Sequence, residues 1–520
     1  MASGGGAFLC STLLSDVHLL QHDMDQSAQL ACILLAVLCA TLYLRIRFDT
    51  LRTIPTIGPS APVLSYIAAY KFLRNAQEVL QEGYNKHKVF KVAMLDRWIV
   101  VVSGAKMNEE LRRLPDEAMS FIDAADEITQ SKYTIAPDVQ KHPIHVKVIK
   151  EHLTRNLAPL LPDIAEEVDY SFQELIPAKQ DEWLAVPAYK TMSEVIARAS
   201  NRVFVGISLC RNPQYLEIAS SFAAEVLRGC TVMGLMPNFL KPIIGPHLPW
   251  SRRAIKRMAP HVIPIIEQRQ RQLEAHGEDW TGKPNDLLMW LVEEANHAGL
   301  ANNMNLLVQS ILTANFVAVH TSSITFTHAL YHLAANSQYT EILRDEVESI
   351  IQQDGWTKIA LGKMWKLDSF LKESQRVNGT SHISVMRIAL KDVVLSDGTM
   401  IPAGTFVAAA ATSTHLDEEN YENAEIFNPF RFSDKRLEDG EKNKHQYVST
   451  SSEYIGFGHG KHACPGRFFA ANELKVMLAH IVLNYDVMFE NEGKKPDNIF
   501  VATTVLPAPD AKVLFRKRSL

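Results

Sequence analysis

A long stretch near the middle of the chain carries no charged side chain. Residues 295–340 contain no Asp, Glu, Lys or Arg. Such a stretch either crosses a membrane or lies in the interior of a protein. Polar residues interrupt the apolar run and argue against a membrane span; they are Gln309, Ser310, Asn315, His320, Thr321, Ser322 and Ser323. We therefore expect a long helix buried at the centre of a large domain.

The pattern outside this stretch is mostly helical, with a few short strands. The chain has 520 residues, 47% of them hydrophobic and 21% charged, so it can bury a large core. The expected class is mainly α with a small β portion, in a single large domain. The periodicity predicts helices within 105–114, 161–175 and 261–276, a hairpin at 89–104, and strands within 384–411 and 500–506.

An apolar segment near the N-terminus predicts a membrane anchor. Residues 28–44 carry no charge, and as a helix they would span ~25 Å, close to the ~27 Å core of the endoplasmic-reticulum bilayer. Arg45, Arg47 and Arg52 follow this segment, whereas no Lys or Arg precedes it. The positive-inside rule therefore places the remainder of the chain in the cytosol. A cleaved signal peptide is the alternative, but it would carry its basic residues on the other side.

These features predict a single-pass protein of the endoplasmic-reticulum membrane with its main domain in the cytosol. Residues 1–27 form a short N-terminal tail and residues 28–44 the transmembrane anchor. Residues 45–62 are a basic, Pro-rich hinge, which we expect to be stiff because proline restricts the backbone. Residues 63–520 form the main domain.

Residues 234–250 place four prolines among apolar side chains. Two interpretations remain open. The segment is either a buried irregular loop, or an apolar lid that dips into the membrane face and admits apolar ligands.

The segment FGHGKHACPGRFFA places one cysteine, Cys464, between a glycine-rich turn and a predicted helix. The six cysteines of the chain are scattered without a CxxC pair, so they predict no disulfide framework. We expect Pro465 to occupy the first helical position. A helix N-terminus favours the thiolate and would lower the pKa of Cys464. The glycines at 456, 458 and 460 allow the backbone to approach a flat partner closely.

Local chemistry leaves three interpretations of this cysteine. Cys464 could ligate haem iron as a thiolate, or it could be a buried structural thiol. It could also bind zinc together with His459 and His462, although that site would need a fourth ligand from elsewhere and would not explain the glycines.

The same segment resembles the haem-binding signature of the cytochromes P450, which reads Phe-x-x-Gly-x-basic-x-Cys-x-Gly. Phe457, Gly460, Cys464 and Gly466 match this signature, and His462 stands where the family usually has arginine. The resemblance implies haem as cofactor, with Cys464 as the axial ligand of the iron.

Other motifs follow in the order of this family. Glu373 and Arg376, in KESQR, lie on one face of a predicted helix, and Arg431 follows in FNPFRF. The resemblance implies that these three residues form a structural network without a chemical role.

AVHTS resembles the oxygen-activating motif of the family in the central helix. Thr321 matches its threonine and Ala318 its small residue, whereas His320 replaces the usual acid. His320 could relay protons, since histidine titrates near neutrality, or it could be a hydrogen-bonded core residue.

Arg387 and His462 correspond to residues that contact the haem propionates in this family. The alternative for Arg387 is an ordinary exposed strand residue. The Trp-x-x-x-Arg motif of the family is not recognisable in this chain, and Lys150 or His145 could replace its contact.

The resemblance implies a monooxygenase that inserts one atom of O2 into an apolar small molecule, with electrons from an NADPH-cytochrome reductase. Lys461, Arg467 and Lys475 could dock this reductase, or they could form an ordinary solvated basic face. The motif variants look most like fungal members of secondary metabolism, in the ent-kaurene-oxidase-like and terpenoid-oxidising groups. Net charge is −5, which does not suggest nucleic-acid binding. By analogy, the pocket walls are residues 121–133, 316–320, 382–386 and 500–505.

Two other functions are compatible with these residues. One is a haem-thiolate isomerase or dehydratase, which the missing acid before Thr321 favours. The other is a membrane-anchored zinc-binding or ligand-binding protein.

Overall fold

The computed structural model describes residues 50–61, 63–135, 137–234, 236, 239–491 and 493–519. The predicted tail (1–27), the predicted anchor (28–44) and residues 45–49 and 62 of the predicted hinge lie outside these residues. The described part is mainly helical, and its strands form four small sheets. This confirms the predicted fold class.

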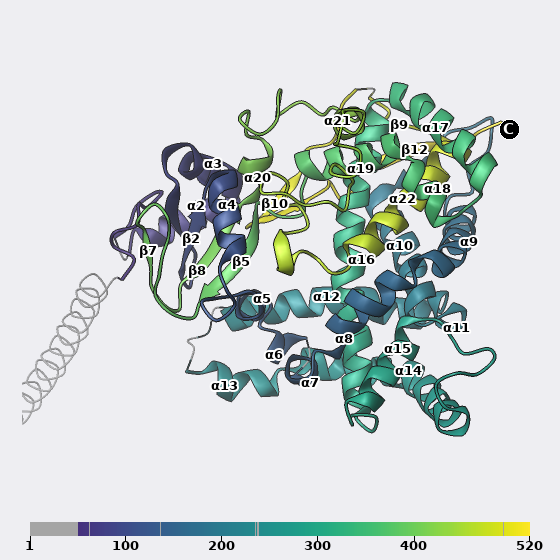
Figure 1. Ribbon diagram of the computed structural model, residues 1–520, viewed down its shortest axis with the longest axis horizontal. Coiled ribbons are helices and arrows are strands. Elements are labelled where there is room, and N and C mark those ends of the chain that lie inside the picture. Colours follow the sequence, from purple (N-terminus) through teal and green to yellow (C-terminus); the bar gives the residue numbers. More distant parts are fainter. Residues whose placement is uncertain are drawn as a thin grey trace, which may run out of the picture.

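The central helix is α16 (Met304–Ala335), which lies near the middle of the molecule (Figure 1). It is the one described helix that is long and apolar enough to cross a membrane, yet 72% of its most apolar window is buried inside the protein. Helices pack around it on several sides, which confirms that the uncharged stretch is a buried helix. They include α10 (Ala188–Phe204), α12 (Pro213–Gly234), α14 (Pro249–His276), α19 (Trp365–Val377) and α22 (Arg467–Asn484).

The largest sheet has five strands in the order β1–β2–β8–β5–β3 and lies to the left of α16 in Figure 1. Its strands are β1 (Val89–Ala93), β2 (Trp98–Val102), β3 (Met119–Ser120), β5 (Ile383–Ala389) and β8 (Phe406–Ala410). β1 and β2 form the predicted antiparallel hairpin, with Val89 opposite Val102. β8 runs parallel to β2, with Phe406 opposite Ile99. The register of β5 against β8 shifts between Ser384 and Arg387, where Val385 has a φ of +49°.

The other elements are shorter or more peripheral. The remaining strands are β4 (Leu184–Pro187), β6 (Val393–Val394), β7 (Met400–Ile401), β9 (Tyr485–Met488), β10 (Ile499–Val501), β11 (Thr504–Leu506) and β12 (Lys512–Lys517). The remaining helices are α2 (Ser65–Arg74), α3 (Ala76–Lys86), α4 (Gly104–Arg113), α5 (Phe121–Thr129), α6 (Ser131–Thr134), α7 (Pro137–Lys141), α8 (Ile144–Lys147), η1 (Val148–Leu153), α9 (Leu157–Leu175), α11 (Ile207–Cys210), α13 (Lys241–Ile244), η2 (Gly245–His247), α15 (Leu287–His297), α17 (Gln338–Asp354), α18 (Lys358–Lys363), α20 (Ala411–His415), α21 (Arg431–Lys435) and η3 (Gly460–His462).

The proline-rich segment 234–250 contains two short helical turns, α13 and η2, between α12 and α14. Phe239 and Ile243 are exposed there, whereas Gly245 is buried against the ring of Tyr133. The segment is therefore neither fully buried nor irregular throughout. Leu235, Pro237 and Asn238 lie outside the described residues.

Candidate active site

The cysteine loop is a tight turn between η3 and α22. The backbone N–H of Cys464 donates to the carbonyl of Phe457 at 2.7 Å, and that of Gly458 donates to the carbonyl of Ile455 at 2.9 Å. Gly458 and Gly460 both have positive φ, +71° and +75°, which a residue with a Cβ adopts only at a cost. A Cβ at Gly460 would lie 2.6 Å from Cδ of Arg112. Glycine at 460 is thus required by both conformation and space.

The helix after the cysteine begins two residues later than predicted. α22 starts at Arg467, so Pro465 lies before the helix and not at its first position. The expectation of a lowered thiol pKa is wrong for the protein alone, because burial by the surrounding chain raises the pKa of Cys464. The N–H groups of Gly466 and Arg467 and the charge of Arg467 oppose this effect only in part.

The side chain of Cys464 faces a hollow formed by three elements. Its lining includes Phe121 from α5, and residues from β5 and the cysteine loop: Ser384, Val385, Met386, Arg387, Phe457, Gly458, His459 and His462. The thiol has no disulfide partner among the described residues and is exposed to this hollow. Three segments that are distant in sequence therefore meet at one sulfur.

Arg387 contributes a buried cation to the same hollow. Its side chain is 1% exposed, so it is not the exposed strand residue of the alternative interpretation. One Nη donates to the carbonyl of Met386 at 2.7 Å, and the guanidinium lies 5.8 Å from the centre of the Phe121 ring. Its Nε has no hydrogen-bond partner among the described residues, and burial lowers the pKa of Arg387 to about 10. A buried guanidinium with an unused N–H group favours an anionic ligand.

His462 lines the same hollow and stacks on Phe121 with ring centres 5.2 Å apart. Its Nε2 is 2.6 Å from Oδ1 of Asp116, which also accepts from Lys461 at 3.0 Å. These two contacts lower the pKa of Asp116. Asp116 was not predicted from the sequence, because it lies far from the motif in the chain.

The residues around Cys464 fit haem. One hollow contains a sulfur that can ligate iron and a buried guanidinium that can bind a carboxylate. Haem carries both groups, an iron and two propionates. Cys464 could hold the iron, and Arg387 and His462 the propionates. Zinc finds less support: no cluster of three or more His, Cys, Asp or Glu side chains occurs in the described chain. His459 contacts Thr450 and Glu109, and His462 contacts Asp116.

The AVHTS motif lies in a part of the buried helix α16 where several side chains are not buried, and we call this part the α16 window. Between Leu306 and Ala335, the side chains that are not buried are those of Phe316, Val317, Ala318, His320 and Thr321. Thr321 is exposed, and its hydroxyl donates to the carbonyl of Val317 at 2.8 Å. Ala318, three residues before Thr321, carries only a methyl group. The window combines apolar side chains with one hydroxyl group and one imidazole.

His320 is tied to a neighbouring helix. Its Nε2 lies 3.2 Å from the carbonyl oxygen of Ser220 in α12. A carbonyl only accepts, so the proton sits on Nε2. Burial lowers the pKa of His320, which keeps the ring neutral. This geometry matches the hydrogen-bonded alternative, and the proton-relay role remains a prediction.

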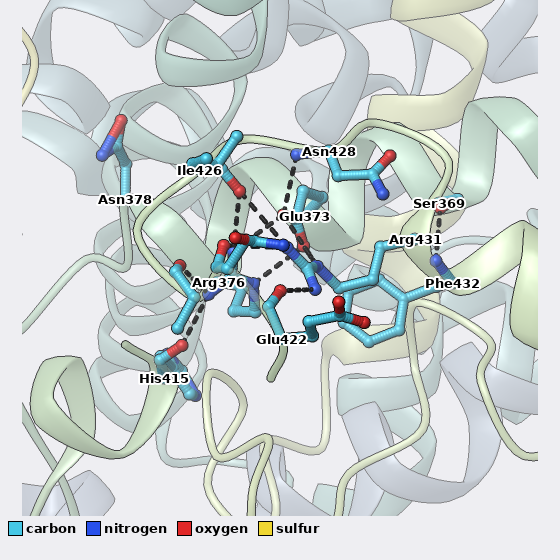
Figure 2. A network of polar contacts seen from close by, with 12 residues as sticks. Ser369, Glu373, Arg376, Asn378, His415, Glu422, Ile426, Asn428, Arg431 and Phe432 are labelled. Atoms are coloured by element: carbon cyan, nitrogen blue, oxygen red, sulfur yellow. Dashed lines mark hydrogen bonds and ion pairs between the residues drawn. The ribbon is translucent and has the colours of Figure 1, made fainter. Parts of the chain in front are cut away.

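Glu373, Arg376 and Arg431 meet in one buried network, as the resemblance implies (Figure 2). Arg376 forms two hydrogen bonds with the carboxylate of Glu373, at 2.7 and 2.8 Å. Arg431 reaches the same carboxylate at 3.1 Å. Arg376 also donates to the carbonyls of His415 and Ala424, each at 2.6 Å. The network therefore ties α19 to residues 415–431.

Several predicted residues lie elsewhere. Lys150 is exposed on η1, and no described contact joins it to the hollow at Cys464. His145 is largely buried, burial lowers its pKa to about 4, and its Nδ1 has no partner among the described residues. His145 thus has an unused polar atom, whereas Lys150 does not face the protein interior.

One member of the predicted reductase-docking set is wrong. Lys475 is buried, and its ammonium group lies 3.0 Å from Asp368, so it cannot contact a partner protein. Position in the motif suggested a surface residue, but α22 is covered on this side by α18 and α19. Arg467 donates to the carbonyl of Cys464 at 2.9 Å. Lys461 is exposed but pairs with Asp116, and its docking role stays a prediction.

The chain is similar to known proteins along most of its length. The family model described as Cytochrome P450 matches residues 55–515. Cytochrome P450 monooxygenase 151 of Postia placenta is 66% identical over 482 residues, covering 93% of this chain and 97% of that protein. Cytochrome P450 monooxygenase CYP512U6 of Ganoderma lucidum is 41% identical over 500 residues, covering 95% of this chain and 97% of that protein. The structure of retinoic acid bound cyanobacterial CYP120A1 has a TM-score of 0.67 at 19% identity, covering 86% of this chain and 96% of that one.

Proposed function

We propose, from the premise that this chain belongs to the cytochrome P450 family and is a haem-thiolate monooxygenase, that it oxidises an apolar secondary metabolite. The substrate class is a terpenoid or a steroid-like compound, and the reaction inserts one atom of O2 into a C–H bond. Membership of this family rules out the alternative of a zinc-binding protein. The relatives are named monooxygenases, so we do not retain the isomerase as a second candidate.

The window on α16 is the observation that carries this proposal. The window offers apolar contacts through Phe316, Val317 and Ala318. Such a lining suits a substrate with few polar groups. Thr321 adds a hydroxyl group to this window, and this hydroxyl donates to the carbonyl of Val317 at 2.8 Å.

Bound haem supplies dioxygen activation and oxygen insertion into the C–H bond. Cys464 would hold the iron, and Phe457 and the glycines at 458, 460 and 466 would keep the loop close to the cofactor. Arg387 and His462 would orient the cofactor through its carboxylates. Thr321 would hold a proton at Oγ1, where its present acceptor is the carbonyl of Val317.

The redox partner and the location are part of the proposal. Electrons would come from an NADPH-cytochrome reductase, and Lys461 offers an exposed cation on the side of the cysteine loop. Residues 28–44 would anchor the enzyme in the endoplasmic-reticulum membrane with the catalytic domain in the cytosol.

The role of Thr321 is tested with Thr321→Ala and a matched control, Thr313→Ala. Thr313 lies on the same helix and makes the same type of hydrogen bond, to the carbonyl of Gln309 at 2.8 Å. We expect Thr321→Ala to keep the spectrum of thiolate ligation, to release more hydrogen peroxide per NADPH and to form less product. Thr313→Ala should keep the coupling of the parent enzyme. Equal coupling in Thr321→Ala and the parent would contradict the role.

The substrate class is tested by feeding candidate terpenoids to cells that express the chain with a reductase. Product with a mass gain of one oxygen, formed only with NADPH, supports the proposal. Turnover without NADPH would instead identify an isomerase. The ligand itself is tested by the absorption band of the reduced, carbon-monoxide-treated enzyme, which should be lost in Cys464→Ser.

A further inference from the structure

A second hollow lies away from Cys464, beside the first described residues of the chain. It has a volume of about 740 Å³, and its lining includes Thr50, Tyr66 of α2, Arg97 of the β1–β2 turn, Glu127 of α5 and Lys241 of α13. None of its lining residues lines the hollow at Cys464. The two hollows are therefore distinct sites.

Lys241 is a buried cation that faces this second hollow. The residue is only 8% exposed and lines the hollow. Its ammonium group has no hydrogen-bond or ion-pair partner among the described residues. The nearby Asp96 and Glu127 are both bound to Arg97. The protein covers most of this side chain and leaves its ammonium group at the hollow without a counter-ion among the described residues, so the position favours an anionic ligand.

An adjoining hollow of about 530 Å³ extends the same surface. Tyr66, Leu95, Asp96, Arg97 and Trp98 line both hollows, so the two are continuous. Arg52, which is exposed, adds a cation to the second part. Cationic side chains outnumber acidic ones along the combined lining in the described chain, which suits an anion.

Exposed apolar side chains surround this cationic hollow. Tyr66 and Ile67 of α2 are 51% and 62% exposed, and Leu95 at the β1–β2 turn is 41% exposed. Phe239 and Ile243, next to Lys241 in sequence, are 73% and 63% exposed. α2 and α13 lie on the same side of the molecule, at the left in Figure 1. A cationic hollow with an apolar rim matches a molecule that has an anionic head and apolar tails.

The position along the chain points to a membrane lipid. Thr50 lines the hollow, and the predicted anchor ends at residue 44. Six residue steps span at most ~21 Å, so the hollow lies close to the end of the predicted membrane segment. Tyr66 and Trp98 in the lining are residue types that are enriched at membrane interfaces.

We propose that this hollow binds the phosphate headgroup of an anionic phospholipid, with Lys241 as the buried cationic contact and Arg52 as the outer one. The acyl chains would lie along Tyr66, Leu95, Phe239 and Ile243. The inference deepens the proposed membrane location and rests on it. Because α13 follows α12, which contacts His320 through Ser220, the lipid would also fix the end of a helix that borders the α16 window.

The test is native mass spectrometry of the full-length holoenzyme in detergent with short-chain phosphatidic acid, with phosphatidylcholine as the zwitterionic comparison. We expect one retained phosphatidic acid, at least ten-fold weaker binding in Lys241→Gln, and unchanged binding in Lys241→Arg. Lys358→Gln, an exposed lysine on α18 at the far side of the molecule, is the matched control. The haem spectrum of each variant shows whether it is folded.

Unchanged binding in Lys241→Gln, or equal retention of phosphatidylcholine, would overturn the proposal. Inorganic phosphate is the third arm: if it displaces the lipid at equal concentration, the site binds a free anion and the lipid assignment is wrong. Carbonate extraction of the wild-type chain from membranes reports separately on the proposed location. Failure of the location therefore differs from failure of the lipid site.

Discussion

At the scale of single residues, Glu473 shows how burial in the core changes a carboxyl group. The residue lies on α22, is fully buried, and accepts one hydrogen bond from Oγ of Ser200 at 2.7 Å. Its Oε2 has no partner among the described residues. Burial raises the pKa of Glu473 to about 8, so the carboxyl group is protonated at neutral pH.

This shift makes stability depend on pH. The pKa of Glu473 is raised from 4.5, so between pH 4.5 and 8 the folded state binds more protons than the unfolded state. The free energy of unfolding therefore falls as pH rises through this window. We expect Glu473→Gln to remove this loss. At pH 8.5 its free energy of unfolding should exceed that of the parent by at least about 1 kcal/mol. Thermal unfolding of the variant and the parent from pH 6 to 9 measures this difference in stability.

The control for this prediction is Glu274→Gln, an exposed glutamate of α14. It should show the same pH dependence as the parent. If Glu473→Gln also parallels the parent over the whole range, the carboxyl group is not buried in its neutral form.

Gly460 allows a second prediction at this scale. Its φ of +75° and the side chain of Arg112 both oppose a Cβ. We expect Gly460→Ala to lower stability by about 1–3 kcal/mol and to reduce the fraction of enzyme that retains haem. Gly362→Ala is the control, since Gly362 lies in α18 with open space around its Cα. Retained cofactor, read from the absorption spectrum, and the midpoint of urea unfolding measure both variants.

At the scale of elements, the buried network of α19 joins a helix to a long connecting segment. Glu373 and Arg376 are both 0% exposed, so their charges interact without water. Arg376 donates to carbonyls at three positions, those of His415, Ala424 and Ile426. The geometry depends on the planar guanidinium, because a lysine cannot reach both the carboxylate and these carbonyls.

We therefore expect Arg376→Lys to destabilise the enzyme by about 2–4 kcal/mol, because it leaves buried carbonyls and part of the carboxylate without donors. Urea unfolding, followed by loss of haem absorption, measures this change. Lys366→Arg is the matched control on an exposed position of the same helix, and it should be nearly neutral. A stability of Arg376→Lys equal to that of the control would show that the network contributes nothing.

The sequence allowed the elements to be predicted where the pattern is local. The uncharged stretch predicted α16, and the two β-rich runs around residues 96 and 97 predicted the β1–β2 hairpin. The residues of the cysteine loop are contiguous, so their motif could be recognised directly. Two contacts could not be predicted from the sequence: that of His462 with Asp116 and that of His320 with the carbonyl of Ser220. Each joins segments that only the tertiary fold brings together. Lys475 was assigned wrongly for the same reason.

At the scale of the whole molecule, the cationic hollow and its apolar rim lie beside the first described residues, which follow the predicted anchor in the chain. Thr50 lines the hollow, and Tyr66 and Ile67 are exposed beside it. Two kinds of membrane contact are therefore expected, one from a spanning helix and one from the surface of the main domain. They differ in strength, since a spanning helix is held effectively irreversibly and a surface contact is not.

This difference predicts the behaviour of two truncations. Removal of residues 1–44 deletes the predicted anchor, whereas removal of residues 1–27 retains it. We expect the shorter deletion to remain in membranes after alkaline carbonate, and the longer one to be extracted. At neutral pH, the longer deletion should still bind vesicles with anionic lipid more than vesicles of phosphatidylcholine alone, and Lys241→Gln should reduce that preference. Carbonate resistance of the longer deletion would mean that residues 28–44 are not the membrane anchor.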